Sequence, residues 1–229
     1  MSSAQLVVVD GFEEAAHETA ELLVAAARRG DWIFLSGGST PRRAYQLAAE
    51  LEPDWSHASV WWGDERCVPP DDERSNFRLA REALLHRLAQ LPVVHRIKGE
   101  LGAEEAASDY EGELAGDMHG FVLLGLGPDG HTASLFPNAP SLDERERLVV
   151  PAEPGLEPFV ERVTLTLPAL AAADELVFLV TGDDKAEAAA RAFGGEPDPA
   201  TPASLTRSSR GSTRAILDRA AAARIRPSR

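Results

Sequence analysis

The chain has 229 residues, of which 44% are hydrophobic and 26% are charged, enough for one sizeable α/β core with few appended modules. Its formal net charge of −14 argues against nucleic acid or an anionic membrane as a partner, because both are bound through basic surfaces. No segment approaches the length of an apolar membrane span, and residues 1–9 lack the pattern of a secretory signal. The single cysteine, Cys67, rules out an intrachain disulfide and fits the reducing cytoplasm, where we expect the protein to work.

Short apolar runs alternate along the chain with Ala-rich amphipathic stretches. We predict buried strands at Leu6–Val9, 33–35, 60–62, 121–124, 163–167 and 176–180, and helices at 13–29, 42–51, 76–89 and 185–193. Continuous apolar runs suit strands that are covered on both faces. The pattern therefore predicts a single α/β domain over residues 1–229, with a mostly parallel twisted sheet, helices on both faces and a frayed tail at 224–229.

Four polar clusters follow predicted strands directly. They are Ser36–Pro41, Gly63–Arg66, Gly127–His131 and Thr181–Lys185. Ligands of open parallel sheets bind at the carboxyl ends of the strands. We therefore expect these four clusters, which are far apart in sequence, to meet in one crevice.

The first cluster, Ser36-Gly37-Gly38-Ser39-Thr40-Pro41, is typical of an anion-binding turn before a helix. Its two glycines allow a tight turn, Ser39 or Thr40 can cap the helix, and Pro41 suits the first helical position. Free N–H groups and the positive end of the helix dipole would then face a phosphate. A well-capped helix without a ligand is the alternative interpretation.

Two cations are candidates to pair with that phosphate. Arg162 precedes the predicted strand at 163–167, and Lys185 ends the fourth cluster. Arginine and lysine both form strong charge-assisted hydrogen bonds with phosphate oxygens. Either residue taken alone could equally be a solvated surface charge.

A glycine-rich turn with Gly125, Gly127 and Gly130 also carries Asp129 and His131. Glycines let the backbone adopt positive φ and approach a ligand closely, and an imidazole near a carboxylate can act as a general base. The spacing matches a dinucleotide-binding G-x-G-x-x-G motif, but prolines within and after the motif prevent the helix that such a site requires. We predict that His131 is a general base and that Asp129 or a backbone carbonyl orients its ring.

Other chemistries lack their sequence signatures. The chain contains no G-x-S-x-G nucleophile elbow, and its six histidines show neither H-x-x-x-H nor H-E-x-x-H spacing. Cys67 has no evident His partner. We therefore expect no nucleophilic serine, no catalytic thiol and no dedicated metal ligands, leaving only an opportunistic metal open.

Several segments together resemble those of the 6-phosphogluconolactonases, over nearly the whole chain. The resemblance rests on Ser36–Pro41 (SGGSTP), Gly63–Arg66 followed by Ser75–Arg78 (GDER…SNFR), Gly125–Pro137 (GLGPDGHTASLFP), Arg162–Pro168 (RVTLTLP) and Gly182–Ala186. One departure is Ala215, where the family usually carries a Trp; we expect it to affect local helix packing more than catalysis.

The resemblance implies a modified Rossmann-like, NagB-type fold and a cytoplasmic enzyme of the oxidative pentose phosphate pathway that needs no cofactor. It implies hydrolysis of 6-phospho-D-glucono-1,5-lactone to 6-phosphogluconate, with the phosphate held by residues 36–40, Arg162 and Lys185. His131 would take a proton from water, and Arg66 or backbone N–H groups of the glycine turn would stabilise the oxyanion. Asp64 would either bind sugar hydroxyls or hold Arg66. Use of the γ-lactone and the oligomeric state stay open.

Glucosamine-6-phosphate deaminases and sugar-phosphate sensor domains share the implied fold and are the alternatives. The deaminases continue their D-G-H turn toward Phe-Asn-Glu-Pro, whereas this chain reads Thr132–Pro137 as the lactonases do. Sensors normally carry an N-terminal helix-turn-helix, while this chain begins almost at its first predicted strand. The sequence therefore favours the lactonase.

Overall fold

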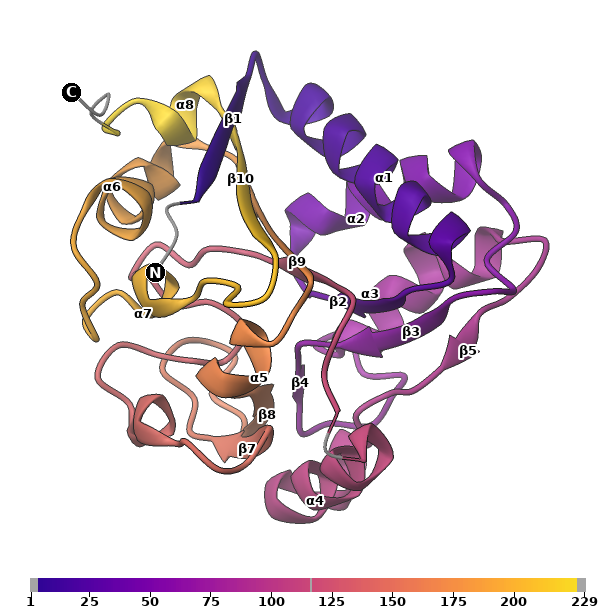
Figure 1. Ribbon diagram of the computed structural model, residues 1–229. Helices are drawn as coiled ribbons and strands as arrows, with labels where there is room; N and C mark the ends of the chain where they lie inside the picture. Colours follow the sequence, from indigo (N-terminus) through magenta and orange to yellow (C-terminus); the bar gives the residue numbers. More distant parts are fainter. Residues whose placement is uncertain (1–3, 116, 226–229) are drawn as a thin grey trace.

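The computed structural model describes residues 4–115 and 117–225 and is built around a seven-stranded sheet (Figure 1). The strands lie in the order β1-β10-β9-β6-β2-β3-β5. Every neighbouring pair is parallel, which confirms the predicted mostly parallel sheet. The strands are β1 (Gln5–Val9), β2 (Trp32–Leu35), β3 (Ser59–Trp62), β5 (Val93–Val94), β6 (Phe121–Leu124), β9 (Glu175–Val180) and β10 (Ser212–Asp218).

Helices cover both faces of this sheet, as Figure 1 shows for α1 and α2 on one side and α6 and α8 on the other. The α-helices are α1 (Phe12–Arg29), α2 (Ser39–Leu51), α3 (Asn76–Ala83), α4 (Ala103–Leu114), α5 (Leu167–Ala171), α6 (Ala186–Gly194), α7 (Pro202–Leu205) and α8 (Arg219–Ala222). Short 3₁₀ turns occur at Leu85–Arg87, Gly99–Leu101, Pro140–Asp143 and Asp183–Lys185. The helix predicted at 76–89 therefore ends early, because the backbone leaves helical geometry at Leu84 (φ −123°).

The sequence explains the limits of the longest helix, α1. Glu13 and Glu14 lie in its first turn and Arg28 and Arg29 in its last, where each sign of charge opposes the helix dipole. Gly30 ends the helix at φ 78°, a left-handed conformation that glycine adopts without strain. A stripe of small residues, mostly alanine, is buried, so α1 approaches α2 and the sheet closely.

A second, antiparallel sheet of three strands lies beside the first. It has the order β4-β8-β7, with β4 at Asp64–Arg66, β7 at Val149–Ala152 and β8 at Arg162–Leu165. The run predicted as a strand at 163–167 is thus β8 of this sheet and not a strand of the parallel one. Its alternation of apolar residues with threonine is the period-two pattern typical of antiparallel strands.

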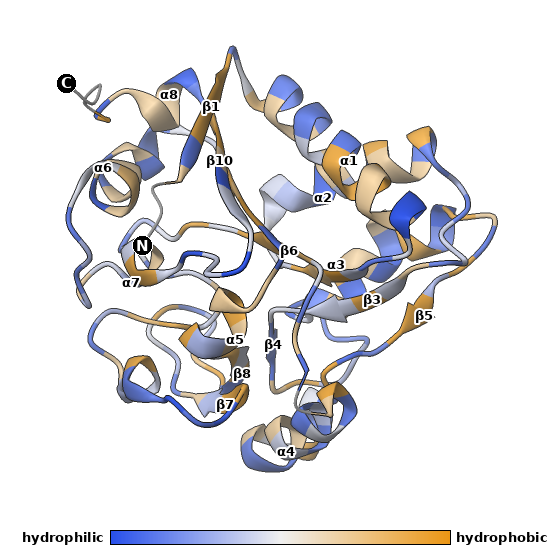
Figure 2. Ribbon diagram, viewed as in Figure 1, coloured by the Kyte–Doolittle hydropathy of each residue, from blue (hydrophilic) through white to orange (hydrophobic). Residues whose placement is uncertain are grey.

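The core lies between the parallel sheet and its helices. β6 and β9 are apolar along nearly their whole length (Figure 2), and the residues of β6 are all buried. Ala215 lies in strand β10, opposite Leu6 of β1 and Phe178 of β9, and its expected effect on local helix packing stays a prediction. It is fully buried where α1 packs on this strand.

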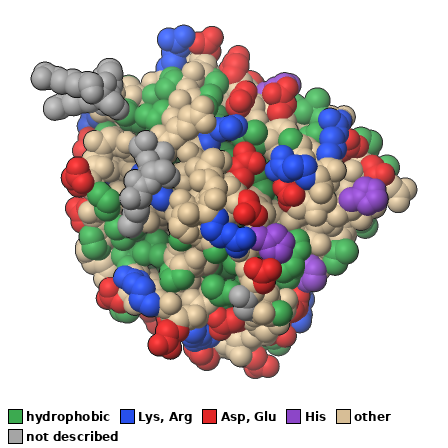
Figure 3. All heavy atoms as spheres, in the orientation of Figure 1, with side chains coloured by type: hydrophobic (Ala, Val, Ile, Leu, Met, Phe, Trp, Pro, Cys, Tyr) green, Lys and Arg blue, Asp and Glu red, His purple; other side chains and the backbone are tan. Residues whose placement is uncertain are grey.

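The surface is mixed in charge. Figure 3 shows acidic and basic side chains interspersed on one face. Of the predicted frayed tail at 224–229, the last four residues lie outside the described part; Arg224 pairs with Glu187, and Ile225 packs against the core. Among the residues that the structure describes, no helix combines the length and apolar character that a membrane crossing requires.

Candidate active site

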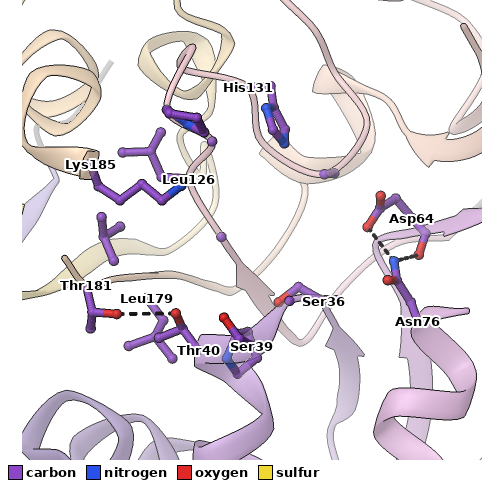
Figure 4. Close-up of a pocket in the computed structure, with 18 of the residues that line it drawn as sticks. Ser36, Ser39, Thr40, Asp64, Asn76, Leu126, His131, Leu179, Thr181 and Lys185 are labelled. Carbon is purple, nitrogen blue, oxygen red and sulfur yellow. Dashed lines mark hydrogen bonds between the residues drawn. The ribbon is translucent and has the colours of Figure 1, made fainter. Parts of the chain in front are cut away.

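The four polar clusters follow four strands that are neighbours in the sheet, β9, β6, β2 and β3. Their residues line one pocket of about 240 Å³ at the carboxyl ends of these strands (Figure 4). The predicted site residues in its wall are Ser36, Gly37, Gly38, Ser39, Thr40, Asp64, Arg66, Gly125, Gly127, His131, Arg162 and Lys185. In Figure 4, His131 and Lys185 face the start of α2 across the pocket, and Asp64 lies at one end.

His131 is held by Asp129 beneath the pocket wall. The Asp129 Oδ1 atom lies 2.6 Å from His131 Nδ1 and also accepts a hydrogen bond from the His131 backbone N–H at 3.1 Å. Partial burial works to raise the pKa of Asp129, but its hydrogen bonds and its interaction with His131 outweigh burial and lower that pKa overall. Asp129 is therefore ionised at neutral pH and accepts a hydrogen bond from a protonated Nδ1 of His131.

Two glycines of this turn are required, for different reasons. Gly130 adopts φ 99°, and the space beside it is filled by Thr201. A Cβ on Gly127 would collide with the His131 ring and the Asp129 carboxylate. Positive φ is thus used at Gly130 and close approach at Gly127, whereas Gly125 shows neither. A Cβ on Gly125 would meet no atom of the described residues within 4 Å.

The N-terminus of α2 is open to the pocket. The helix begins at Ser39 with Gly38 as N-cap (φ 107°), and no side chain in the described part of the chain caps it. The prediction that Ser39 or Thr40 caps the helix and that Pro41 is its first residue is therefore wrong. Instead, the Thr40 hydroxyl lies 3.2 Å from that of Thr181. An uncapped helix start leaves backbone N–H donors for an anion.

Ser36 adds a free donor beside this helix. The Tyr45 hydroxyl accepts from the Ser36 N–H at 2.9 Å and donates to the Ser36 carbonyl at 2.7 Å, which fixes the loop. The Ser36 side chain is buried and lines the pocket, yet its Oγ has no hydrogen-bond partner among the described residues. A buried hydroxyl without a partner is costly unless a ligand supplies one.

Two arginines of neighbouring strands line the pocket. Arg66 of β4 and Arg162 of β8 are paired in register. Burial first, and then the charge of Arg66, lower the pKa of Arg162. Within residues 4–115 and 117–225, neither arginine forms an ion pair with a carboxylate, and the Nε atom of each is buried without a partner. Their charges are thus available to an anionic ligand.

Arg162 and Lys185 also have partners close to them in sequence. Arg162 donates to the carbonyls of Leu156 (3.1 Å) and Pro158 (3.2 Å), and its guanidinium lies 5.4 Å from the centre of the Phe136 ring. Lys185 lies 3.1 Å from Asp184, whose side chain is 63% exposed, so this ion pair is well solvated and weak.

Asp64 is held by neutral side chains. Ser134 donates to its Oδ2 at 2.6 Å, and Asn76 donates to its Oδ1 at 3.2 Å and to its carbonyl at 2.9 Å. In the described residues Asp64 forms no ion pair with Arg66, so the expectation that it holds Arg66 is wrong. Sequence reasoning missed Asn76 and Ser134, although both lie within segments singled out for the family resemblance.

Glu65 points away from the pocket and anchors α3. Its carboxylate accepts hydrogen bonds from the backbone N–H groups of Asn76 and Phe77, both at 2.8 Å, and from the Ser75 hydroxyl at 3.0 Å. Burial raises the pKa of Glu65 to about 7, although these hydrogen bonds lower it. The sequence did not predict this anchoring role, because the alternation of side chains along β4 is visible only once the strand is known.

Cys67 follows this strand and is half-buried. Burial first, and then the charges of Glu161 and Glu65, raise the pKa of its thiol to about 11. It is therefore a neutral thiol at physiological pH and a poor nucleophile. No cluster of three or more potential metal ligands occurs among the residues that are described.

Comparison with known proteins points to one family. The family of glucosamine-6-phosphate isomerases/6-phosphogluconolactonase matches residues 9–215. The 6-phosphogluconolactonase of Mycobacterium tuberculosis is 37% identical over 219 residues, 87% of each chain. The human 6-phosphogluconolactonase is 38% identical over 221 residues, covering 90% of this chain and 84% of the human protein.

Comparison with solved structures points to the same fold. The 6-phosphogluconolactonase of Leishmania guyanensis superposes with a TM-score of 0.85 at 29% identity, covering 96% of this chain and 98% of that one. A monomeric glucosamine-6-phosphate deaminase of the NagB superfamily gives a TM-score of 0.81 at 18% identity, a likeness that shows the fold alone. The chain therefore belongs to the family of glucosamine-6-phosphate isomerases and 6-phosphogluconolactonases and has its NagB-type fold.

Proposed function

We propose that this protein hydrolyses 6-phospho-D-glucono-1,5-lactone to 6-phosphogluconate in the cytoplasm, as an enzyme of the oxidative pentose phosphate pathway. The observation that carries the proposal is the composition of a single pocket. It combines an imidazole held by a carboxylate with an uncapped helix N-terminus and two arginines that have no carboxylate partner among the described residues. This set suits a substrate with one phosphate and one acyl centre. The relatives at 37% and 38% identity carry the name of that enzyme.

The phosphate is bound at the start of α2. Backbone N–H groups of residues 37–40 and the Ser36 hydroxyl donate to its oxygens, and Lys185 and Arg162 supply positive charge. In a chain with a formal net charge of −14, the helix dipole and these local cations set the potential inside the pocket. Binding the phosphate there leaves the lactone carbonyl to face His131.

The chemical step uses His131 as a general base. Because ionised Asp129 can only accept, it keeps the proton on His131 Nδ1, and Nε2 is free to take a proton from water. The water oxygen bonds to C1, and the carbonyl electrons move to oxygen, whose negative charge Arg66 and backbone N–H groups of the glycine turn stabilise. When the C1–ring oxygen bond breaks, protonated His131 returns its proton to the ring oxygen. The step consumes one water and needs neither metal nor cofactor.

A coupled assay tests this function. The purified protein, without added metal or nucleotide, is expected to accelerate the loss of freshly generated 6-phosphogluconolactone above its spontaneous hydrolysis. It is expected to release no ammonia from glucosamine 6-phosphate. Ammonia release without lactone hydrolysis would overturn the proposal in favour of a deaminase, and binding of sugar phosphates without either activity would favour a sensor.

A further inference from the structure

The carboxylate of Asp64 joins two loops that are distant in sequence. Its Oδ2 accepts from Ser134, three residues after His131, and its Oδ1 accepts from Asn76, the first residue of α3. All three side chains are buried, with exposed fractions of 0% for Ser134, 2% for Asn76 and 5% for Asp64. Hydrogen bonds to a charged group in such surroundings are stronger than those between neutral groups.

Asn76 also fixes the loop before α2. A Cβ on Gly37 would collide with the Asn76 side-chain amide, so this amide packs directly against the backbone of the loop. The backbone of Asn76 is in turn held by Glu65 from the other face of β4. Asn76 therefore contacts the loop at residues 36–38, which we call the phosphate loop. It also contacts Asp64 (Figure 4).

Ser134 acts in the same way on residues 127–134, which carry His131 and which we call the histidine loop. Besides donating to Asp64, its backbone N–H donates to the Thr164 hydroxyl at 3.2 Å. Thr164 pairs with Asp64 across β4 and β8 and lies two residues from Arg162. One serine thus ties the segment that carries His131 to both strands that carry the arginines.

We infer that Ser134 and Asn76 are positioning residues that act through Asp64 and hold the histidine loop, the arginine-bearing strand β4 and the phosphate loop in one geometry. The inference rests on the proposed function. Because neutral donors occupy both oxygens of Asp64, this carboxylate holds the loops together without forming a contact ion pair with Arg66. Arg66 keeps its charge for the substrate.

The test is a double-mutant cycle on lactone hydrolysis. Ser134→Ala is expected to lower kcat about 10-fold to 100-fold, because small misplacements of a catalytic group cost rates of this order, while the affinity for 6-phosphogluconate changes less than threefold. In an Asp64→Ala background, measured at high enzyme concentration, adding Ser134→Ala is expected to change kcat less than twofold. Asn76→Ala in the same cycle provides a second test if a Ser134 variant does not fold.

A matched control separates positioning from general stability. Ser208 is also a buried serine whose hydroxyl donates, here to the carbonyl of Ala173, but it lies outside the pocket. Ser208→Ala is expected to lower the melting temperature without changing kcat. The inference is overturned if folded Ser134→Ala keeps kcat within twofold of wild type, or if its effect is the same with and without Asp64. Lack of lactonase activity in the wild type would instead refute the proposed function.

Discussion

Replacing Gly127 with Ala is expected to slow catalysis by displacing the His131 ring. The added Cβ would overlap Nδ1 and Cε1 of that ring and Oδ1 of Asp129, closer than real Cβ contacts occur. The backbone of the turn cannot yield easily, because the Gly127 N–H donates to the His131 carbonyl at 2.8 Å and its own carbonyl accepts from Gly130 at 3.0 Å. The side chains of His131 and Asp129 must therefore move.

The size of the effect follows from that displacement. Relieving the overlap needs a shift of roughly 1 Å, which for a catalytic group costs on the order of 100-fold in rate, or about 2.7 kcal/mol in the activation free energy. Overpacking of this kind also lowers the free energy of unfolding by about 1–3 kcal/mol. Phosphate affinity is expected to change little, because the start of α2 lies on the opposite side of the pocket (Figure 4).

Gly125 provides the matched control, two residues away in the same turn. Within the described part of the chain, a Cβ there would meet no atom within 4 Å, and Gly125 does not adopt positive φ. Steady-state kinetics of both variants are compared with their melting temperatures. Gly125→Ala is expected to keep kcat near that of the wild type, although its Cβ lines the pocket and can raise KM. If Gly127→Ala keeps normal kcat, the close packing of this glycine does not set the position of His131.

Three further predictions follow from the same geometry. His131→Ala and His131→Gln are both expected to lower kcat about 10²-fold to 10⁴-fold with the fold and 6-phosphogluconate affinity retained, since neither side chain can accept the proton; near-normal kcat in a folded His131→Ala protein would assign the base to another group. Lys185→Ala is expected to raise KM for the phosphorylated lactone about 10-fold to 100-fold, because it removes a charge-assisted contact worth about 1.5–3 kcal/mol; an unchanged KM would remove Lys185 from the phosphate site. Arg162→Ala should also destabilise the protein, because it removes the hydrogen bonds to Leu156 and Pro158. Because the pKa of Glu65 is raised from 4.5 to about 7, its contribution to stability is fully present below pH 4.5 and is lost as pH rises through 7. In denaturant titrations, the free energy of unfolding of the wild type relative to Glu65→Gln should fall by about 3 kcal/mol across that window, and a difference that does not change with pH would contradict the burial argument.

The parallel sheet and the edge that carries the site could be predicted from local sequence patterns. Apolar runs such as Phe121–Leu124 are buried strands, and the polar residues that follow them must lie at their carboxyl ends. The order β9-β6-β2-β3, which makes the four clusters neighbours, depends on pairing between distant segments and leaves no pattern in any one of them. Convergence was therefore predictable, but its arrangement was not.

Some strands escaped prediction because their residues do not form the apolar runs typical of buried strands. β4 consists of Asp64, Glu65 and Arg66, all charged, and its pairing with β8 supplies the stability that its composition does not. β10 was missed because polar and charged residues such as Arg214 interrupt its apolar run. In both cases tertiary pairing overrides local propensity.

Side chains proposed to act directly on the ligand were easier to find in the sequence than the side chains that hold the catalytic groups in place. A base or a cation beside a buried strand is conspicuous because its chemistry is costly to bury; His131 follows β6, and Arg162 begins β8. Ser134 and Asn76 are ordinary polar residues whose importance depends on Asp64, which lies 70 residues from Ser134 in sequence. The hydrogen bonds that fix the geometry are made between segments, so only the folded chain reveals that Asp64 links the loops and leaves Arg66 unneutralised.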